Sequence, residues 1–334
     1  MHETVIWGAG AIGGTVGAYL ARAGMDPLMV DTDAAHVATM SANGLKITGP
    51  IEQFTAPVRA LTPDQVRTPI RRVLLAVKGQ HSAAAARMIA PLLAPDASVL
   101  SLQNGLNSAA IAGQIATERV LLALVNFASD YIAPGEVLYG GRGSVLIGAM
   151  DGRITPRVAD YVSLLKRFDE RIEATDNVVG LLWGKIGYGG LLIATALTND
   201  TMAAVLADRH WHPVLARIGG EIMRVAYASG ITPVGVDGFD AEGFARGDEL
   251  RITASCDDMA EHYRHSAKSR SGIWRDLAVR KRKTEVEAQF APVIAAGKRH
   301  GIATPTLERL ATMIREMEDG QRDFSRDNLA ELAN

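Results

Sequence analysis

The sequence predicts an α/β fold in which an N-terminal, Rossmann-type doubly wound parallel sheet is followed by an all-α C-terminal domain. Three observations support this. A Gly-x-Gly-x-x-Gly segment at residues 8–13 directly follows an apolar run at the chain start. Short apolar runs then alternate with helix-like stretches through the first half, which is typical of a parallel sheet covered by helices. From about residue 176 the apolar residues recur at helical spacing instead.

The expected strands are continuous apolar runs, as is typical of strands buried on both faces. We expect them at Thr4–Trp7, Leu28–Asp31, Val73–Val77, Val99–Leu102 and Val120–Asn126. The helices between them are expected at Ala11–Ala23, Gln80–Leu93 and Ser108–Ala116. Pro-Gly and Gly-Gly turns between residues 132 and 148 predict antiparallel hairpin strands that extend the same sheet.

The second half is expected to consist mainly of helices. The segments with helical spacing are 177–198, 211–229, 256–264, 274–299 and 305–318. In the fourth of these, Val279, Val286 and Phe290 lie on one face at 100° per residue. We place the boundary at residue 174, giving a dinucleotide-binding domain over 1–174 and a helical substrate and dimerisation domain over 175–334.

Composition argues against several kinds of partner. The 334 residues carry 35 Lys plus Arg and 37 Asp plus Glu, so the net charge of −2 gives no electrostatic reason to expect nucleic acid or an anionic membrane. The single cysteine, Cys256, excludes an intrachain disulfide and a thiolate metal cluster. We expect no metal site, no signal peptide and no membrane span, and therefore a cytoplasmic protein.

The segment Gly8-Ala9-Gly10-Ala11-Ile12-Gly13 is expected to bind the pyrophosphate of a dinucleotide. Gly8 permits the tight turn after the strand, Gly10 lets the backbone approach the pyrophosphate, and Gly13 lets helix and strand pack closely. The helix that begins there offers free N–H groups and a favourable dipole to the anion. A glycine-rich turn without a ligand is the alternative.

Asp31 indicates which dinucleotide is bound. It lies 18 residues after Gly13, at the end of the second expected strand. A carboxylate there accepts hydrogen bonds from the adenosine ribose and repels a 2′-phosphate. No Arg or Lys occurs between Asp31 and Lys46. The sequence therefore predicts NAD rather than NADP, unless Asp31 only caps the following helix.

Several short motifs, in this order, resemble those of the ketopantoate reductase (2-dehydropantoate 2-reductase) family. They are residues 8–13, Val77-Lys78-Gly79-Gln80, Gln103-Asn104-Gly105, Leu182-Trp183-Gly184-Lys185, Lys283-Thr284-Glu285 and the stretch from His300 to Pro305. The resemblance implies hydride transfer between a nicotinamide and the 2-keto group of a small acid. Together the motifs span almost the whole chain.

The resemblance also implies roles for individual residues. Lys185 would be the general acid, Asn104 would arrange substrate and nicotinamide, and Glu285 would contact the substrate. Lys78 would lie along the cofactor, and we expect Gln80 in the same motif to bind it too.

Some of these residues also have structural interpretations. Asn104 followed by glycine is a common turn dipeptide. Glu285 stands four residues after Lys281 and so fits a surface pair on a helix. Gly187, Gly189 and Gly190 indicate either a kink beside the site or close helix packing.

The chain departs from the family where the substrate would be held. Family members carry Asn four and often eight residues after the catalytic Lys, and this chain has Gly189 and Ile193 there. Tyr188, three residues after the Lys, is expected to supply a hydroxyl instead. The family's carboxylate-binding Ser would fall on Ile273, and Ser271 is the nearest candidate.

We therefore expect an NAD-dependent dehydrogenase acting on a small-molecule hydroxy/keto substrate that is larger or less polar than ketopantoate. One alternative is a genuine 2-dehydropantoate 2-reductase. The other is a non-catalytic NAD-binding protein. The family also suggests a homodimer formed through the helical domain.

Overall fold

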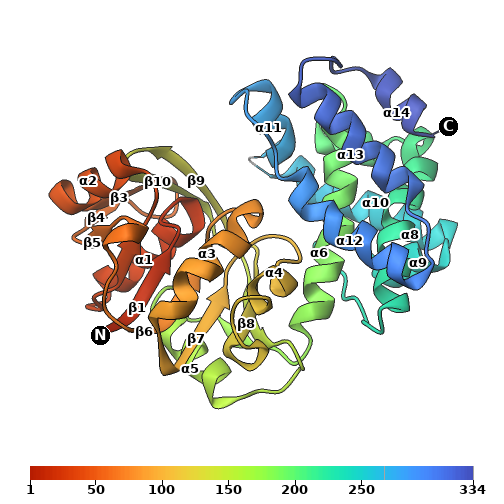
Figure 1. Cartoon of the computed structure of the whole chain (residues 1–334). Coiled ribbons are helices and arrows are strands. Elements are labelled where there is room, and N and C mark those ends of the chain that lie inside the picture. Colours follow the sequence, from red (N-terminus) through yellow and green to blue (C-terminus); the bar gives the residue numbers. More distant parts are fainter. Residues whose placement is uncertain (267, 334) are drawn as a thin grey trace. The chain divides into compact units, whose positions relative to one another are not determined.

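The computed structural model describes residues 1–266 and 268–333, which divide into two compact units. The first unit, Met1–Val178, contains the sheets, and the second, Val179–Asn334, is helical (Figure 1). The division falls at Val178, where the sequence suggested residue 174.

β1 lies inside an eight-stranded sheet of order β12-β11-β8-β7-β6-β1-β2-β5. Its strands are β1 (His2–Trp7), β2 (Leu28–Val30), β5 (Arg59–Leu61), β6 (Ile70–Leu75), β7 (Leu93–Ser101), β8 (Val120–Val125), β11 (Val145–Ala149) and β12 (Glu173–Ala174). β2 and β6 pair with β1 in parallel on its two sides. The chain therefore reverses its direction of sheet growth at β1, which is where open α/β sheets bind ligands. The predicted Rossmann-type sheet is confirmed.

The hairpin predicted between residues 132 and 148 forms, but not in the predicted sheet. β9 (Ala128–Ala133) and β10 (Glu136–Gly141) pair antiparallel within a second sheet of order β4-β3-β10-β9. This sheet also contains β3 (Leu45–Thr48) and β4 (Phe54–Ala56). Only β11 extends the main sheet, antiparallel to β8. The prediction was wrong because β10 pairs in parallel with β3, which places the hairpin in the second sheet.

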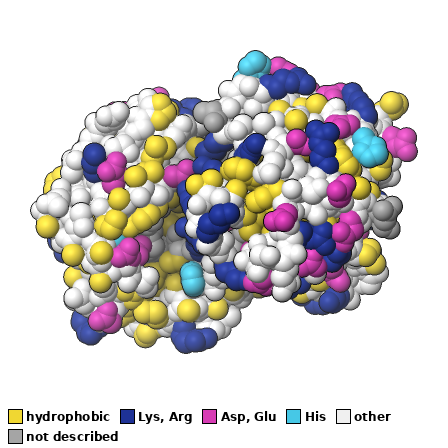
Figure 2. All heavy atoms as spheres, turned by 90° about the horizontal axis from the view of Figure 1, so that it is seen from above, with side chains coloured by type: hydrophobic (Ala, Val, Ile, Leu, Met, Phe, Trp, Pro, Cys, Tyr) yellow, Lys and Arg dark blue, Asp and Glu magenta, His cyan; other side chains and the backbone are white. Residues whose placement is uncertain are grey.

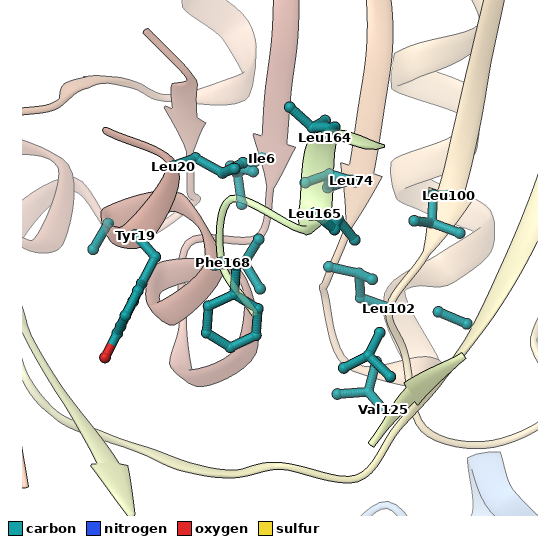
Figure 3. Packing of buried hydrophobic residues seen from close by; sticks show 14 of the residues in the cluster. Ile6, Tyr19, Leu20, Leu74, Leu100, Leu102, Val125, Leu164, Leu165 and Phe168 are labelled. Atoms are coloured by element: carbon teal, nitrogen blue, oxygen red, sulfur yellow. The ribbon is translucent and has the colours of Figure 1, made fainter. Parts of the chain in front are cut away.

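Helices and apolar side chains cover the main sheet. The helices of this unit are α1 (Ala11–Arg22), α2 (Ala34–Asn43), α3 (Ser82–Ile89), α4 (Ser108–Ala112) and α5 (Pro156–Leu165), with single 3₁₀ turns at Pro63–Gln65, Gly79–His81, Ala90–Leu92 and Thr117–Arg119. Figure 3 shows Ile6, Leu74 and Leu100 from neighbouring strands beside Leu164 and Leu165 of α5. Each of these side chains is buried, and burying one contributes about 1.5–3 kcal/mol.

The helical unit is built around α6 (Val178–Thr195). Its other helices are α7 (Met202–Ala207), α8 (His212–Ala228), α9 (Ala241–Arg246), α10 (Glu249–Arg264), α11 (Gly272–Ala278), α12 (Val286–His300), α13 (Pro305–Glu318) and α14 (Arg326–Ala333), with a 3₁₀ turn at Arg209–Trp211. By length and composition alone α6 could cross a membrane, which the shorter runs in the sequence had not suggested. However, 78% of that window is buried inside the structure, as in the core helix of a globular unit.

The single helix predicted over 274–299 is two helices, α11 and α12, separated by residues 279–285. Lys281 has φ +49, in the left-handed region that a continuous helix does not contain. Val279 is 67% exposed, so it does not belong to the buried stripe that Val286 and Phe290 form.

Charged side chains on the helical unit largely pair with one another. Arg322, for example, contacts both Glu316 and Glu331. Lys or Arg and Asp or Glu lie side by side over the right-hand part of the face shown in Figure 2. Exposed pairs of this kind contribute about 0–1 kcal/mol each, so they affect solubility more than stability.

Candidate active site

The glycine-rich loop follows β1 and fits closely against the strand next to it. Gly8 has φ +99, and a Cβ at this position would lie 2.6 Å from the backbone nitrogen of Val77. A Cβ on Gly13 would lie 2.0 Å from the carbonyl oxygen of Gly8. Both positions therefore require glycine, one for the turn and one for the contact between α1 and the loop.

Gly10 differs from these two glycines because its surroundings are open. Among the described residues, no heavy atom beyond its chain neighbours lies within 4 Å of a Cβ built there. Gly10 is also the N-cap of α1, so no side chain caps the amides of the first turn, to which Ala11, Ile12 and Gly13 contribute. An open cradle with helix N–H groups at its base fits a pyrophosphate.

Asp31, directly after β2, is bonded to the same loop. Its Oδ2 accepts the N–H of Ala9 at 2.9 Å, and its Oδ1 accepts the N–H of Asp33 at 3.0 Å. The helix-cap alternative for Asp31 is wrong, because Asp33 is the residue that caps α2. Asp31 therefore lies where a carboxylate can serve both the loop and a ribose.

A buried histidine holds the other side of Ala9. Nε2 of His36, on α2, lies 3.0 Å from the carbonyl oxygen of Ala9, and Nδ1 accepts the N–H of Gly135 at 2.8 Å. This arrangement requires a neutral imidazole with its proton on Nε2. No sequence pattern identifies His36 as part of the site, because its partners are 27 and 99 residues away.

The segments after β6 and β7 are tied together by Gln103, which is buried. Its Nε2 donates to the carbonyl of Val77 and to Oγ of Ser82, both at 2.8 Å. Lys78 comes directly after this anchored carbonyl, and Gln80 is exposed on the following 3₁₀ turn. Gln103 belongs to one of the motifs, but no sequence pattern indicates its positioning role, because its partners lie 21 and 26 residues away.

Asn104 follows β7 at the same edge of the sheet. Its side chain is exposed, its carbonyl oxygen accepts from Nδ2 of Asn107 at 2.7 Å, and Gly105 has φ +90. The turn interpretation of this dipeptide is thus correct for the backbone, and it leaves the Asn104 side chain at the surface. Gly8, Asp31, Lys78 and Asn104 come after four adjacent parallel strands, so they lie along the same edge of the sheet, which is where open α/β sheets bind ligands.

In the helical unit, the glycines of α6 allow neighbouring segments to approach closely. A Cβ on Gly184 would lie 1.7 Å from the carbonyl oxygen of Val234, and one on Gly187 would lie 2.6 Å from Cζ of Phe239. Gly190 has a similar contact 2.8 Å from Cδ1 of Ile222. Since α6 runs uninterrupted over Val178–Thr195, these glycines indicate close packing rather than a kink.

Gly189 is the exception on this helix. Among the described residues outside α6 itself, no heavy atom lies within 4 Å of a Cβ built there. It stands four residues after Lys185, so both residues lie on one face of α6, and both are partly exposed. Ile193, eight residues after the lysine, is buried. Of the two positions where the resemblance implies an amide, the one at Gly189 is therefore open space and the one at Ile193 is filled by an apolar side chain.

Lys185 lies in a partly buried corner of the helical unit. Burial lowers the pKa of its ammonium from 10.5 to about 8, and the carboxylate of Asp237 acts in the opposite direction. The hydroxyl of Tyr188 hydrogen-bonds that of Tyr263 on α10, with the two rings stacked at 6.3 Å. Burial raises the pKa of Tyr263 to about 12 and also raises that of Tyr188, so both phenols stay neutral.

Glu285 and Ser271 lie at the ends of α12 and α11. Glu285 is the partly buried N-cap residue of α12. The helix-surface pair with Lys281 is wrong, because the segment joining them is not helical. Ser271 is buried and accepts the N–H of Trp274 at 3.2 Å as the N-cap of α11. Its hydroxyl proton can still be donated to an acceptor.

The predicted site residues are thus divided between the two units. Lys185, Tyr188 and Glu285 lie in the helical unit. Asn104 and the predicted cofactor-binding residues lie in the sheet unit. Cys256, the one cysteine, is buried, and burial raises the pKa of its thiol to about 12, so it does not act as a thiolate near neutral pH.

Comparison with known proteins relates both units to one family. Residues 4–152 match the model described as "Ketopantoate reductase PanE/ApbA", and residues 181–318 match the model of its C-terminal part. A 2-dehydropantoate 2-reductase of Mesorhizobium japonicum is 27% identical, over 94% of this chain and 97% of the relative. One of Halobacterium salinarum is also 27% identical, over 94% and 98% of the two chains.

Solved structures are also similar to this chain over nearly its whole length. A PanE/ApbA family ketopantoate reductase from Ralstonia eutropha has a TM-score of 0.79 and 27% identity, covering 96% of this chain and 99% of its own. A D-mandelate dehydrogenase, solved with NADH and anilino(oxo)acetate, has a TM-score of 0.82 at 21% identity, with the same coverage. At that identity the second likeness concerns the fold alone.

Proposed function

Because this chain belongs to the ketopantoate reductase family, we propose that it is an NAD-dependent oxidoreductase that interconverts a hydroxy acid and the corresponding keto acid other than ketopantoate. The observation that carries the substrate proposal is the open space at Gly189, on the face of α6 that bears Lys185. The family-level activity, nicotinamide-dependent oxidation or reduction at a CH–OH group, is common to the curated relatives.

The proposed chemistry assigns the proton to Lys185. A bound nicotinamide would supply or accept the hydride. When hydride reaches a carbonyl carbon, negative charge develops on the oxygen, and the Lys185 ammonium stabilises this charge and then gives up its proton. A lysine whose pKa is lowered to about 8 is well matched to this task, because it exchanges its proton near the operating pH. Tyr188 would add a neutral hydroxyl beside it.

The preference for NAD rests on Asp31. Its carboxylate lies at the end of β2 and is fixed by the N–H groups of Ala9 and Asp33. A fixed negative charge at this place accepts ribose hydroxyls and opposes a 2′-phosphate. The D-mandelate dehydrogenase of similar fold was solved with NADH, which is consistent with NAD use in this fold.

Larger substrates are favoured by the shape of α6. An amide four residues after the lysine would hydrogen-bond a small hydroxy acid, and glycine there offers space in its place. A site built without polar partners for the hydroxyls of ketopantoate gives that substrate little preference. We therefore expect 2-keto acids with a bulkier, less polar substituent to be turned over better than ketopantoate.

A substrate panel tests the proposal. Purified protein is assayed with NADH and NADPH against ketopantoate and a series of aliphatic and aryl 2-keto acids, following the absorbance of the reduced nicotinamide. We expect the highest kcat/KM with NADH and a bulky keto acid. A ketopantoate kcat/KM of about 10⁴ M⁻¹s⁻¹ or above that exceeds the other values would establish the alternative named by the curated relatives, a 2-dehydropantoate 2-reductase. Cofactor binding without any turnover would favour a non-catalytic protein.

The same assay tests the role of Lys185. Lys185→Met keeps a long unbranched side chain but has no proton to give. We expect kcat to fall roughly 10²–10⁴-fold, the usual contribution of general acid–base catalysis, while NAD affinity stays within about twofold because Lys185 and the phosphate loop lie in different units. A near-normal kcat would leave Tyr188 as the proton donor to test next.

A further inference from the structure

The loop between α8 and α9, residues 229–240, carries a carboxylate that acts on Lys185 and that none of the motifs includes. It belongs to Asp237, whose charge acts on the ammonium of Lys185 and on the phenols of Tyr188 and Tyr263. The four side chains come from three segments that are distant in sequence. They form one cluster in the helical unit.

The loop is held against α6 on both sides of Asp237. Before it, Val234 donates its N–H to the carbonyl of Gly180 at 3.0 Å. The carbonyl oxygen of Val234 lies so close to Gly184 that any side chain there would displace it. After Asp237, the ring of Phe239 packs on Gly187. The distance between Asp237 and α6 is therefore fixed by backbone and ring contacts.

The same loop is also held against α10. Ser255, a buried residue, donates its hydroxyl to the carbonyl of Gly238 at 2.7 Å and accepts the N–H of Asp240 at 3.0 Å. Asp240 in turn forms an ion pair with Arg251 at 2.6 Å. The residues next to Asp237 are thus anchored to the helix that also supplies Tyr263.

The backbone of Asp237 adopts a conformation that few residues tolerate. Its φ is +48, and among the described non-glycine residues only Lys281 shares a positive φ. Asp and Asn are the side chains best able to occupy this region, and such conformations persist where the surrounding structure determines them. The hydrogen bonds and ring contacts of the residues next to Asp237 hold its backbone in this conformation.

We propose that Asp237 is a positioning residue for the general acid, with its carboxylate holding the Lys185 side chain in its charged form beside the Tyr188–Tyr263 pair. The inference rests on the proposed role of Lys185. Burial by itself destabilises the ammonium, and Asp237 offsets part of this cost, so that Lys185 remains protonated near neutral pH. Among the described residues, Asp237 on the loop is the charged group that acts on Lys185, and it acts also on Tyr188 of α6 and Tyr263 of α10, whose phenols stay neutral.

Titration of the full-length protein by NMR tests the proposal without relying on turnover. Lysine labelled with ¹³C at Cε gives one signal per side chain, and Lys185→Met identifies that of Lys185. We expect a midpoint of about 8 for the unmodified protein. In Asp237→Asn the midpoint should be about one pH unit lower, the lower end of the range for a nearby opposite charge. Asn keeps the backbone preference of this position.

Kinetics on the same variant provide a second readout. The rate of keto-acid reduction declines where Lys185 loses its proton, so this decline should move to lower pH together with the NMR midpoint. At pH 8 a midpoint one unit lower leaves the Asn variant about fivefold slower in reduction. Asp237→Gly removes the same charge and relaxes the backbone, so both variants should move the midpoint equally if the charge is responsible.

Asp258→Asn is the matched control. Asp258 is exposed on α10, and its Cβ lies 3.0 Å from the Cβ position of Gly238, so it flanks the same loop. Its variant should leave the Lys185 midpoint unchanged. An unmoved midpoint in Asp237→Asn, or an equal shift in Asp258→Asn, would overturn the proposal. A shifted midpoint in a protein that turns over no keto acid would support the role of Asp237 and count against the proposed function instead.

Discussion

The buried ammonium of Lys185 should reduce the stability of the protein, and its removal should therefore increase it. The unfolded chain holds Lys185 in water with a pKa near 10.5, whereas burial lowers the pKa to about 8 in the folded protein. Protonated lysine thus favours the unfolded state. Lys185→Met removes the charge and keeps the length of the side chain, so the helical unit should unfold at higher denaturant concentration.

The size of this effect follows from the two pKa values. At 1.36 kcal/mol per pKa unit, the difference between 10.5 and about 8 corresponds to about 3 kcal/mol, with a range of about 2–4 kcal/mol. The cost is fully present below the folded pKa of about 8, where both states carry the proton. It declines as pH rises toward 10.5, because the folded state has then released its proton while the unfolded state still binds it. The advantage of the variant should therefore shrink between pH 8 and pH 10.5.

Urea denaturation from pH 6.5 to pH 10.5 measures this difference. Three of the four tryptophans, Trp183, Trp211 and Trp274, lie in the helical unit, so their fluorescence reports mainly on its unfolding. Lys298→Met, at a 73% exposed side chain of α12, serves as control and should change stability by less than about 0.5 kcal/mol at every pH. A Lys185→Met protein that is no more stable at pH 7, or whose advantage does not change with pH, would refute the reasoning.

Three further predictions address the cofactor, the substrate and the packing of α6. Asp31→Asn removes the charge but keeps an oxygen for the loop, and it should reduce the ratio of NAD affinity to NADP affinity, measured by calorimetry, by roughly tenfold. Tighter binding of NADP than of NAD by the unmodified protein would contradict the role proposed for Asp31. Gly189→Asn should raise kcat/KM for ketopantoate and lower it for bulky keto acids, since it fills the open space with an amide; parallel losses for both would show that Gly189 does not select substrate. Gly184→Ala should lower the free energy of unfolding, measured by urea denaturation, by about 1–3 kcal/mol, because its Cβ would displace the carbonyl of Val234. Gly189→Ala should raise the free energy of unfolding by up to about 1 kcal/mol through helix propensity. Similar effects of the two substitutions would contradict the packing argument.

The parts of the fold that the sequence predicted are those with local causes. The turn at Gly8, the start of α1 and the apolar strands follow from residues within a few positions of one another, so pattern alone identifies them. α13 was predicted at its observed bounds, because Pro305 begins it and the apolar spacing continues to Glu318. The nine-residue β7 was predicted too short, since its first half contains Pro95 and Asp96 and does not resemble a buried strand.

The parts that the sequence missed depend on contacts between distant segments. His36 and Gln103 act through backbone groups that are 26 or more residues away, and no spacing rule connects such partners. No sequence pattern points to Asp237, because a loop acid is usually exposed and without a specific role, and only the anchoring of its loop brings it to Lys185. The hairpin at Pro134 was recognised locally, yet its sheet partner, β3, lies about 90 residues earlier.

Under the proposed function, the residues around Lys185 that would move the proton are held separately from the position that would admit the substrate. Lys185 and Asp237 are held by contacts of Gly184 and Gly187 with the loop at Val234 and Phe239, so the charge arrangement depends on faces of α6 that are already packed. Gly189 lies on the open face and makes none of these contacts. Under the proposed function, a change at Gly189 would therefore alter which keto acid fits without disturbing the protonation of Lys185, so that a family member could lose the amide that suits a small hydroxy acid and retain the proton transfer.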